Sequence, residues 1–193
     1  MKSPTAAGGH LARSPRDEYA IFETGFGSCA IAWRGERVRA VQLPGRTREA
    51  TRRRLLRVTP GARETAAPSY IVSVSDRISA ILEGKGTGVT FADVALDLSG
   101  VTPFYRAVLL AARELPPGET VTYGWLATHI GHPRSARVVG AALGRNPVPI
   151  IVPCHRVVAA NGKTGGFSAP GGVATKIRLL ASERGFGALF AQR

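Results

Sequence analysis

The sequence predicts a small α/β unit followed by a mainly α-helical part that contains a helix-turn-helix. Short or alternating apolar runs broken by glycine fill residues 19–43, whereas apolar residues recur with helical spacing after residue 102. Between them, the stretch SGVTPF at 99–104 combines turn residues with a helix-start signal. We therefore expect a flexible tail over residues 1–17, an N-terminal α/β domain over 18–98 and a C-terminal domain over 99–193.

The N-terminal domain is expected to be a small sheet with helices. Residues 19–43 predict two or three strands with tight turns, and residues 89–98 alternate like one more strand. Helical spacing predicts helices over 47–58 and 73–84, the second ending at a glycine. The arginine triplet at 52–54 could touch DNA, but a charge run on a short helix is usually solvated, and a solvated face is what we expect.

The C-terminal domain begins with a helix that Thr102 can cap and whose first turn suits Pro103. Its apolar face comprises Phe104, Val108, Leu109 and Ala112, and it stops at Pro116 and Pro117. Two short helices follow, over about 123–130 and from Ser135 to about Leu143, with the break GHP between them. This outline is that of a winged-helix-like helix-turn-helix, although many helical domains contain such a corner.

The rest of the chain reads as a short apolar strand, a Cys-His pair, a glycine-rich loop over 159–172 and a final helix, VATKIRLLASERG. The NGKTGG segment of the loop lacks the residue order of a phosphate-binding loop. We therefore expect no nucleotide site.

Charge points to a polyanionic partner. The chain has 26 Lys and Arg against 13 Asp and Glu, a formal net charge of +13. From Val101 onward there are 11 basic and 3 acidic residues. Such an excess favours nucleic acid through counterion release. No apolar run approaches the length of a membrane span and the N-terminus lacks a secretory signal, so we expect a cytoplasmic monomer with no membrane partner.

The two cysteines, Cys29 and Cys154, are expected to be reduced. Cys29 lies within a predicted strand and is expected to be a small buried hydrophobe. Cys154 is followed by His155 and Arg156, and a thiol beside positive charge and a histidine can act as a nucleophile. Adjacent residues of an extended segment point to opposite sides, so proton transfer from Cys154 to His155 requires a bridging water or a sharp turn.

A histidine that acts as a base needs a partner to fix its tautomer, usually a carboxylate. Only Glu114, Glu119 and Glu183 are available after residue 100, and Glu183 is the candidate because it lies on the final helix beside apolar residues. A structural His-Glu pair is an equal alternative. No metal site is expected, because the histidines and cysteines lack ligand spacing; His129 and His132 are expected at the surface.

The block GRNPVPIIVPCHRVV, with TVTYGWLA upstream and GGFS downstream, closely resembles the O6-alkylguanine-DNA alkyltransferases, also called methylated-DNA-protein-cysteine methyltransferases. The resemblance covers about residues 101–185, whereas the first hundred residues match only in outline. It implies direct repair of O6-alkylguanine, and of O4-alkylthymine, in double-stranded DNA by irreversible transfer of the alkyl group to a cysteine. Each molecule acts once, after flipping the base, and no cofactor is consumed.

The resemblance also implies roles for individual residues. Cys154 is the acceptor thiolate, His155 the base acting through a water, Glu183 the carboxylate that orients His155, and Asn146 the support of the active-site turn. Tyr123 moves the 3′ phosphate and helps protonate the leaving guanine, and Arg137 fills the space of the flipped base. Ser135, Ala136, Gly140 and Ala141 join Arg137 and Tyr123 in contacting DNA through the minor groove. The pocket is formed by Pro149, Val157, Phe167 and Ser168.

Two departures from the family pattern stand out. The loop has Ala169 and Pro170 between Ser168 and the following glycine pair, where many members run straight from serine to the glycines, and Phe167 stands where some have tyrosine. Both differences are expected to affect the size of the alkyl group accepted. The structural zinc that some members carry is not expected, with Cys29 the only cysteine of the N-terminal part.

Three other functions are compatible with parts of the sequence. Alkyltransferase-like proteins flip the lesion without repairing it, but commonly carry tryptophan at the cysteine position. A transcriptional regulator that uses the helix-turn-helix is a weaker alternative, because no extra sensor domain is recognisable in the 193 residues. A Cys-His hydrolase would need an oxyanion motif or acyl pocket, and neither is recognisable here.

Overall fold

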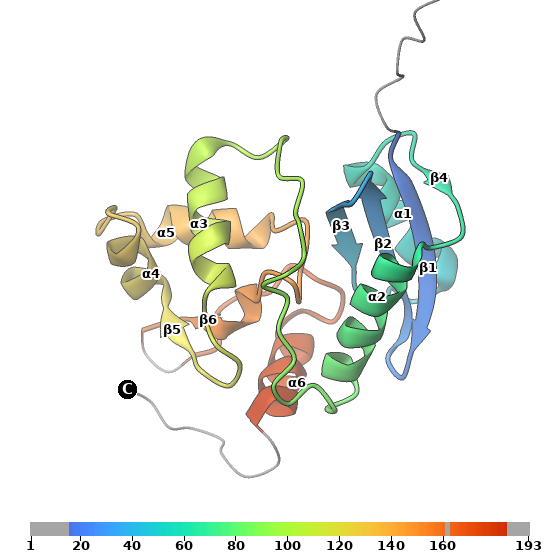
Figure 1. Cartoon of the computed structure of the whole chain (residues 1–193). Helices are drawn as coiled ribbons and strands as arrows, with labels where there is room; N and C mark the ends of the chain where they lie inside the picture. The colour runs from blue at the N-terminus through green and yellow to red at the C-terminus, as the bar shows by residue number, and fades with distance from the viewer. Residues whose placement is uncertain (1–15, 161–162, 185–193) are drawn as a thin grey trace, which may run out of the picture.

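Three consecutive strands form the N-terminal sheet, and a short fourth strand joins its edge (Figure 1). The computed structural model describes residues 16–160 and 163–184. Strands β1 (Glu18–Thr24), β2 (Gly27–Arg34) and β3 (Arg37–Gln42) are antiparallel, and β4 (Arg63–Glu64) lies parallel to β1. The strands predicted over 19–43 are confirmed, and there are three. Most of the predicted tail, residues 1–15, lies outside the described residues.

Both faces of strand β2 are buried, each against a different helix. Cys29, Ile31 and Trp33 belong to the core cluster that includes residues of α2 (Ser69–Leu82), whereas Ala30 and Ala32 pack in a second cluster with Leu55 of α1 (Arg48–Val58). Alternate strand residues point to opposite faces, so this division follows from the pleat. The N-terminal part is therefore α/β, as predicted.

Helix boundaries in this part follow local signals. The Thr47 side chain accepts a hydrogen bond from Ala50 N at 3.1 Å and caps α1, which confirms the helix predicted over 47–58. Helix α2 begins at Ser69, directly after Pro68, rather than at residue 73. It ends before Gly84, whose φ of +74° suits glycine.

The strand predicted over 89–98 is wrong. This segment contributes only an isolated bridge between Leu96 and Val38, in which Val38 N donates to Ala95 O and Asp97 N donates to Val38 O, both at 2.9 Å. A turn closed by Val94 N and Phe91 O, at 3.0 Å, interrupts the extended conformation. The segment is therefore an irregular connection, and its alternating apolar residues are those whose side chains are buried in the core.

The C-terminal part contains the four helices expected from the sequence. These are α3 (Pro103–Arg113), α4 (Tyr123–His129), α5 (Ala136–Gly144) and α6 (Gly172–Arg184). A pair of short parallel strands, β5 (Val121–Thr122) and β6 (Val157–Val158), was not predicted. Residues 130–135 connect α4 to α5, and these two helices pack against each other and against α3.

Helix α4 carries an exposed aromatic pair. Its N-terminus is capped by the Thr122 hydroxyl, which accepts a hydrogen bond from Trp125 N at 3.0 Å. The Trp125 side chain is 48% exposed and stacks on the His129 ring, with 4.8 Å between ring centroids. His129 and His132 are both exposed, as predicted.

The short strand predicted before Cys154 is also wrong, because residues 146–153 form a tight turn. Val152 N donates to Val148 O at 2.9 Å, and Pro149 and Val152 form an isolated bridge. Ile150 has a φ of +75°, and it is the one non-glycine residue with positive φ in residues 16–160 and 163–184. A β-branched residue rarely adopts this conformation, so tertiary packing holds the turn.

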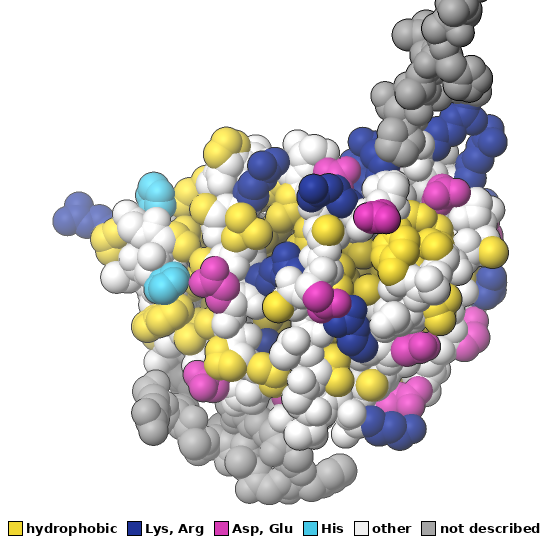
Figure 2. All heavy atoms as spheres, viewed as in Figure 1, with side chains coloured by type: hydrophobic (Ala, Val, Ile, Leu, Met, Phe, Trp, Pro, Cys, Tyr) yellow, Lys and Arg dark blue, Asp and Glu magenta, His cyan; other side chains and the backbone are white. Residues whose placement is uncertain are grey.

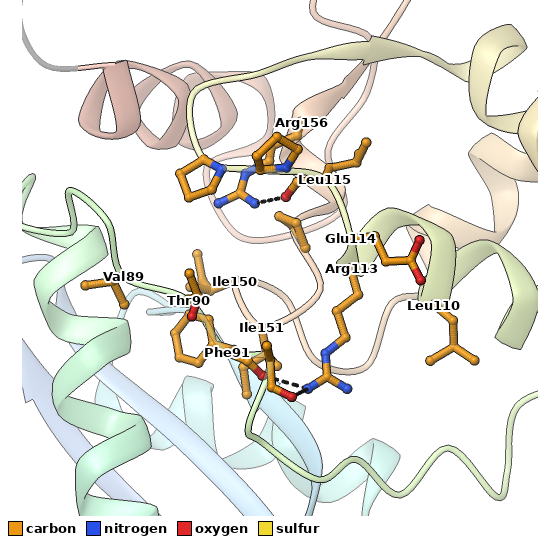
Figure 3. A pocket seen from close by; sticks show the side chains of 14 residues that line it. Val89, Thr90, Phe91, Leu110, Arg113, Glu114, Leu115, Ile150, Ile151 and Arg156 are labelled. Atoms are coloured by element: carbon orange, nitrogen blue, oxygen red, sulfur yellow. Dashed lines mark hydrogen bonds between the residues drawn. The ribbon is translucent and has the colours of Figure 1, made fainter.

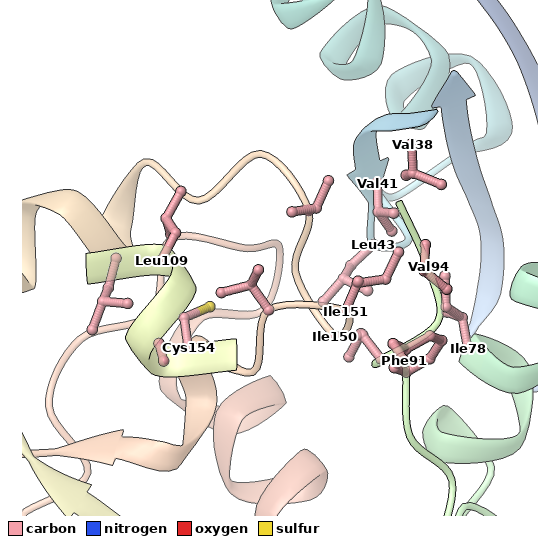
Figure 4. Packing of buried hydrophobic residues seen from close by; sticks show 14 of the residues in the cluster. Val38, Val41, Leu43, Ile78, Phe91, Val94, Leu109, Ile150, Ile151 and Cys154 are labelled. Atoms are coloured by element: carbon pink, nitrogen blue, oxygen red, sulfur yellow. The ribbon is translucent and has the colours of Figure 1, made fainter. Parts of the chain in front are cut away.

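This turn also joins the two parts of the molecule. Ile150 and Ile151 lie beside Phe91, Val94, Val41 and Leu43, whereas Cys154 lies beside Leu109 of α3 (Figure 4). Val41 N additionally donates to Pro147 O at 2.8 Å. One hydrophobic core therefore runs from the N-terminal sheet to the surroundings of Cys154. Across the described parts of the chain, no helix combines the length and apolar character needed to cross a membrane.

Candidate active site

Cys154 opens a single 3₁₀ turn, η1 (Cys154–Arg156), rather than continuing an extended segment. Cys154 N donates to Val152 O at 2.8 Å, and Arg156 N donates to Pro153 O at 2.9 Å. The chain is thus sharply turned at Cys154, but His155 Nδ1 has no hydrogen-bond partner among the described residues, so the turn alone does not join it to Cys154. The Cys154 residue is 8% exposed, and it reaches the wall of a pocket.

That pocket has a volume of about 500 Å³ and lies between α5 and the glycine-rich loop. Seven of the residues singled out from the sequence line it: Tyr123, Ala136, Arg137, Gly140, Cys154, Phe167 and Ser168. Leu143, Gly144 and Gly166 complete the lining. Residues from four separate segments, namely α4, α5, η1 and the glycine-rich loop, are thus brought to one cavity.

The remaining singled-out residues lie elsewhere. Ser135 occupies the N-cap position of α5, and Ala141 is exposed on that helix. Pro149 is buried in the turn, and Val157 is fully buried in β6. Because none of these four lines the pocket, their roles in binding remain predictions.

His155, Arg156 and Glu183 form a buried network. The His155 Nε2 atom lies 2.8 Å from Glu183 Oε1, and the side chains are 1% and 3% exposed. Arg156 donates from Nε to Glu183 Oε2 at 2.9 Å and from Nη2 to Oε1 at 2.6 Å. Gly118 N also donates to Glu183, at 3.2 Å, and Arg156 Nη1 donates to Leu115 O. The carboxylate predicted to partner His155 is therefore at hydrogen-bond distance.

Glu183 and His155 differ in their ionisation state. Burial raises the pKa of Glu183, but the hydrogen bonds from His155 and Arg156 outweigh burial and lower it to about 2. Burial lowers the pKa of His155, and the adjacent Glu183 offsets only part of that shift. The carboxylate is thus charged and paired with Arg156, while the imidazole is neutral near pH 7.

The tautomer of His155 follows from its contacts. A neutral imidazole whose Nε2 faces a carboxylate oxygen carries its proton on Nε2, which leaves Nδ1 with a lone pair. The Nδ1 atom is buried and has no hydrogen-bond partner among the described residues. His155 therefore has a lone pair on Nδ1 that no described residue engages in a hydrogen bond, which is what accepting a proton requires.

Asn146 spans the turn that leads to Cys154. Its Nδ2 atom donates to Val152 O at 2.8 Å, and its Oδ1 atom accepts from Val148 N at 3.0 Å. A single amide side chain thus holds both arms of the turn. Burial raises the pKa of Cys154, and the Asn146 side chain and the charge of Lys176 oppose that shift only in part.

Lys176 was missed in the sequence, although it is fully buried next to the site. Its Nζ atom donates to Val157 O at 2.6 Å and lies 5.7 Å from the centre of the Tyr123 ring. Burial lowers the pKa of Lys176 to about 8. A signal was present: Lys176 precedes Glu183 by two helical turns, so both lie on one face of α6.

A second pocket, of about 590 Å³, lies on the other side of the active-site turn (Figure 3). Its wall includes Ile150, Ile151 and Arg156 from the turn and Arg113 from the end of α3. The Arg113 side chain donates to the carbonyl groups of Phe91 and Val94. Cys154 does not line this pocket, so the smaller cavity is the one that combines space with a nucleophile. Within residues 16–160 and 163–184 no group of three potential metal ligands is present.

Comparison with known proteins assigns the chain to a family. Residues 103–185 match the model described as "6-O-methylguanine DNA methyltransferase, DNA binding domain". The chain is 42% identical over 120 residues to the methylated-DNA–protein-cysteine methyltransferase of Mycolicibacterium paratuberculosis, an alignment that covers 62% of this chain and 69% of that protein. The chain belongs to the methylated-DNA–protein-cysteine methyltransferase family.

Solved methyltransferase structures resemble the whole fold. The Mycobacterium tuberculosis OGT in complex with DNA has a TM-score of 0.70 and 33% identity, covering 86% of this chain and 92% of that one. The O6-methylguanine-DNA methyltransferase of Pyrococcus kodakaraensis has a TM-score of 0.64 and 26% identity, covering 86% and 98%. The likeness to other methyltransferases therefore includes the N-terminal sheet, where the sequence matched only in outline.

Proposed function

We propose that the protein repairs DNA by transferring an alkyl group from the O6 atom of guanine to Cys154 Sγ. Cys154 stays alkylated, so each molecule acts once, and O4-alkylthymine is the second substrate. The observation that carries this proposal is a cysteine at the wall of a pocket, in the same turn as a buried His155–Glu183 hydrogen bond. A buried structural cysteine needs neither a pocket nor a base.

The chemistry balances within the site. The Cys154 thiol gives its proton through a water to His155 Nδ1, and the thiolate attacks the alkyl carbon. The bond between that carbon and O6 breaks as the bond to sulfur forms, and guanine leaves with the electron pair. Tyr123 donates a proton to the leaving guanine anion, which becomes neutral guanine, and the proton held by His155 passes through water to the Tyr123 phenolate. Glu183 and Arg156 keep His155 in the required tautomer.

We propose that α4 and α5 form a winged-helix-like helix-turn-helix whose second helix lies in the minor groove of double-stranded DNA. Arg137 is exposed and also lines the pocket, so it can occupy the stack while the alkylated base turns inward. Close approach of α5 is favoured by small residues: Ser135, Ala136, Gly140 and Ala141. Gly140 lies against the Tyr123 ring, where an added Cβ would be 3.7 Å from it.

The walls of the pocket are proposed to select the base. Phe167 packs beside it, and Ser168 presents backbone groups to its edge. Pro149 and Val157 lie behind this lining, where Lys176 holds the Val157 carbonyl, and we propose that they support it. Asn146 fixes the turn that presents Cys154. In this proposal residues 99–193 form the DNA-binding and alkyl-transfer domain, residues 18–98 support it, and the monomer is the active unit.

The experiment uses the full chain and a duplex oligonucleotide that contains O6-methylguanine. After incubation, mass spectrometry of the peptide that contains Cys154 should show one added methyl group, and the duplex should contain guanine. Cys154→Ala should remove transfer while the duplex still binds. Cys29→Ala is the matched control, because burial raises the pKa of Cys29 to about 12 and its thiol is unreactive.

Two outcomes would overturn the proposal. An unmodified Cys154 peptide beside an intact lesion would indicate binding without transfer. Methyl groups that appear on Cys29, with transfer surviving in Cys154→Ala, would place the chemistry elsewhere.

A further inference from the structure

The glycine-rich loop forms one wall of the proposed alkyl pocket, and its carbonyl groups are held one after another. Ala169 O accepts from Gly172 N at 3.0 Å, and Pro170 O accepts from the Thr175 hydroxyl at 2.7 Å. Both donors belong to the start of α6. Ser168 O accepts from Arg54 Nη2 at 3.4 Å, across 114 residues of sequence. The side of the loop that faces the pocket is therefore held from the N-terminal sheet domain.

The three consecutive arginines of α1 have different surroundings, because successive helical residues point about 100° apart. Arg52 Nε donates to the Tyr19 hydroxyl at 2.8 Å within the N-terminal part. The Arg53 side chain is 67% exposed and lies near Glu49 on its own helix. Arg54 is half-buried, and it is the member that reaches the loop. We expected all three arginines to be solvated. Within the triplet, Arg53 is exposed, whereas Arg52 and Arg54 are partly buried.

The Arg54 guanidinium is partly buried where it meets the loop. Its Nε atom is buried without a partner among the described residues, so part of the guanidinium is held out of water. Burying a donor in this way is unfavourable unless the rest of the group gains something. The charged guanidinium gains a carbonyl acceptor in Ser168, and such charge-assisted bonds are stronger than neutral ones.

We infer that Arg54 is a positioning residue that holds the Phe167–Ser168 wall and thereby limits the size of the alkyl group that Cys154 accepts. The inference rests on the proposed transfer reaction and gives the N-terminal domain a part in it. Phe167 and Ser168 line the pocket directly, so a displacement of Ser168 changes the space beside Cys154. Small alkyl groups need this wall in place for alignment, whereas bulky groups need it to move aside.

The test measures single-turnover rate constants at saturating protein on two duplexes, one with O6-methylguanine and one with O6-benzylguanine. Arg54→Met keeps the aliphatic stem and removes every donor. It should lower the methyl rate about fivefold, as expected for the loss of one hydrogen bond, and lower the benzyl rate less. The ratio of benzyl to methyl rates should therefore rise about threefold or more, a change that general destabilisation would not produce.

Arg53→Met is the matched control, because it changes the neighbouring arginine without contacting the loop, and its ratio should equal that of the unmodified protein. If Arg54→Met fails to fold, Arg54→Lys can be tested instead. Lysine keeps the positive charge but has one ammonium group in place of the forked guanidinium, so the ratio of benzyl to methyl rates should shift in the same direction. An unchanged ratio in a folded Arg54 variant would overturn the inference while leaving the transfer reaction intact. If the unmodified protein transfers neither group, the proposed function itself fails.

Discussion

Cys154 sits where burial opposes ionisation. Its pKa is raised, so the resting side chain is a thiol, and the thiolate must form as part of the transfer. In the proposed reaction the base for that step is the neutral His155, whose Nδ1 has no hydrogen-bond partner among the described residues.

The rate of transfer should depend on the protonation of His155. Burial lowers the pKa of His155 below its ordinary value of 6.5, so the base is neutral at pH 7 and above. Once the pH falls below that lowered pKa, the rate constant should drop about tenfold per pH unit, because the protonated imidazole cannot accept the thiol proton. Single-turnover rates between pH 5 and pH 8, with duplex binding measured at each pH, check this. A rate constant that rises towards acid pH would contradict it.

For individual residues, the sequence predicted that His155 and Glu183 would lie together, and the structure places them at hydrogen-bond distance. Cys154 and His155 are adjacent, and Glu183 could be selected because few carboxylates were available. Arg156 and Lys176 were not assigned their contacts, since buried cations are recognised only when their acceptors are known. Arg156 meets Glu183 and Lys176 meets Val157 O, both across the fold.

The turn over residues 146–153 is the element on which the site depends. It contains the positive φ of Ile150, buries Ile150 and Ile151 against the N-terminal part, and presents Cys154 at its end. Apolar composition alone predicted a strand here, because a run of Val, Ile and Pro gives no sign of the side-chain hydrogen bonds that bend it. The local signal lay in Asn146, an amide able to bridge two backbone groups.

Asn146→Ala should loosen this turn. The change removes the hydrogen bonds to Val152 O and Val148 N, and unpaired backbone groups should cost about 2 kcal/mol of unfolding free energy. Misplacement of Cys154 should also lower the transfer rate about 10-fold to 100-fold. Denaturant unfolding and single-turnover rates measure the two effects.

Asn146→Asp is the comparison for that change. It keeps the acceptor for Val148 N and loses the donor to Val152 O. The unfolding free energy of Asn146→Asp should therefore lie between those of Asn146→Ala and the unmodified protein. Equal stability of Asn146→Ala and the unmodified protein would mean that packing alone holds the turn.

Positive charge is a property of the whole molecule. On the face in Figure 2, Lys and Arg side chains are spread over both parts and interspersed with acidic groups. The net charge of +13 therefore acts as a general attraction for DNA rather than through one patch on that face. Composition alone was enough to predict this class of partner.

The salt dependence of duplex binding should distinguish general electrostatic attraction to DNA from preferential binding of the alkylated duplex. The logarithm of the duplex binding constant should fall with the logarithm of salt concentration, with a slope of about −0.9 for each phosphate neutralised. Arg134→Ala, in the connection between α4 and α5, should make the slope shallower by about one unit and keep the preference for alkylated duplex. Arg137→Ala should keep the slope and lose that preference. Titrations at several salt concentrations check both, and a salt-independent affinity would contradict them.

The sequence did not predict that one hydrophobic core would connect the N-terminal sheet to the surroundings of Cys154. A change of apolar periodicity predicted a division near residue 99, but contacts such as Ile151 with Val41 and Leu43 join segments about a hundred residues apart. Nothing local encodes such pairings, and the link from Arg54 to Ser168 was hidden for the same reason.

The aromatic pair on α4 gives the protein an intrinsic optical reporter. Of the two tryptophans in the chain, Trp33 is 1% exposed inside the sheet, whereas Trp125 stacks on His129 at the surface of the helical pair. Indole fluorescence responds to its surroundings, so emission from Trp125 should change when a duplex covers α4, while emission from Trp33 stays constant. Binding by each variant described above can therefore be followed on the unlabelled chain.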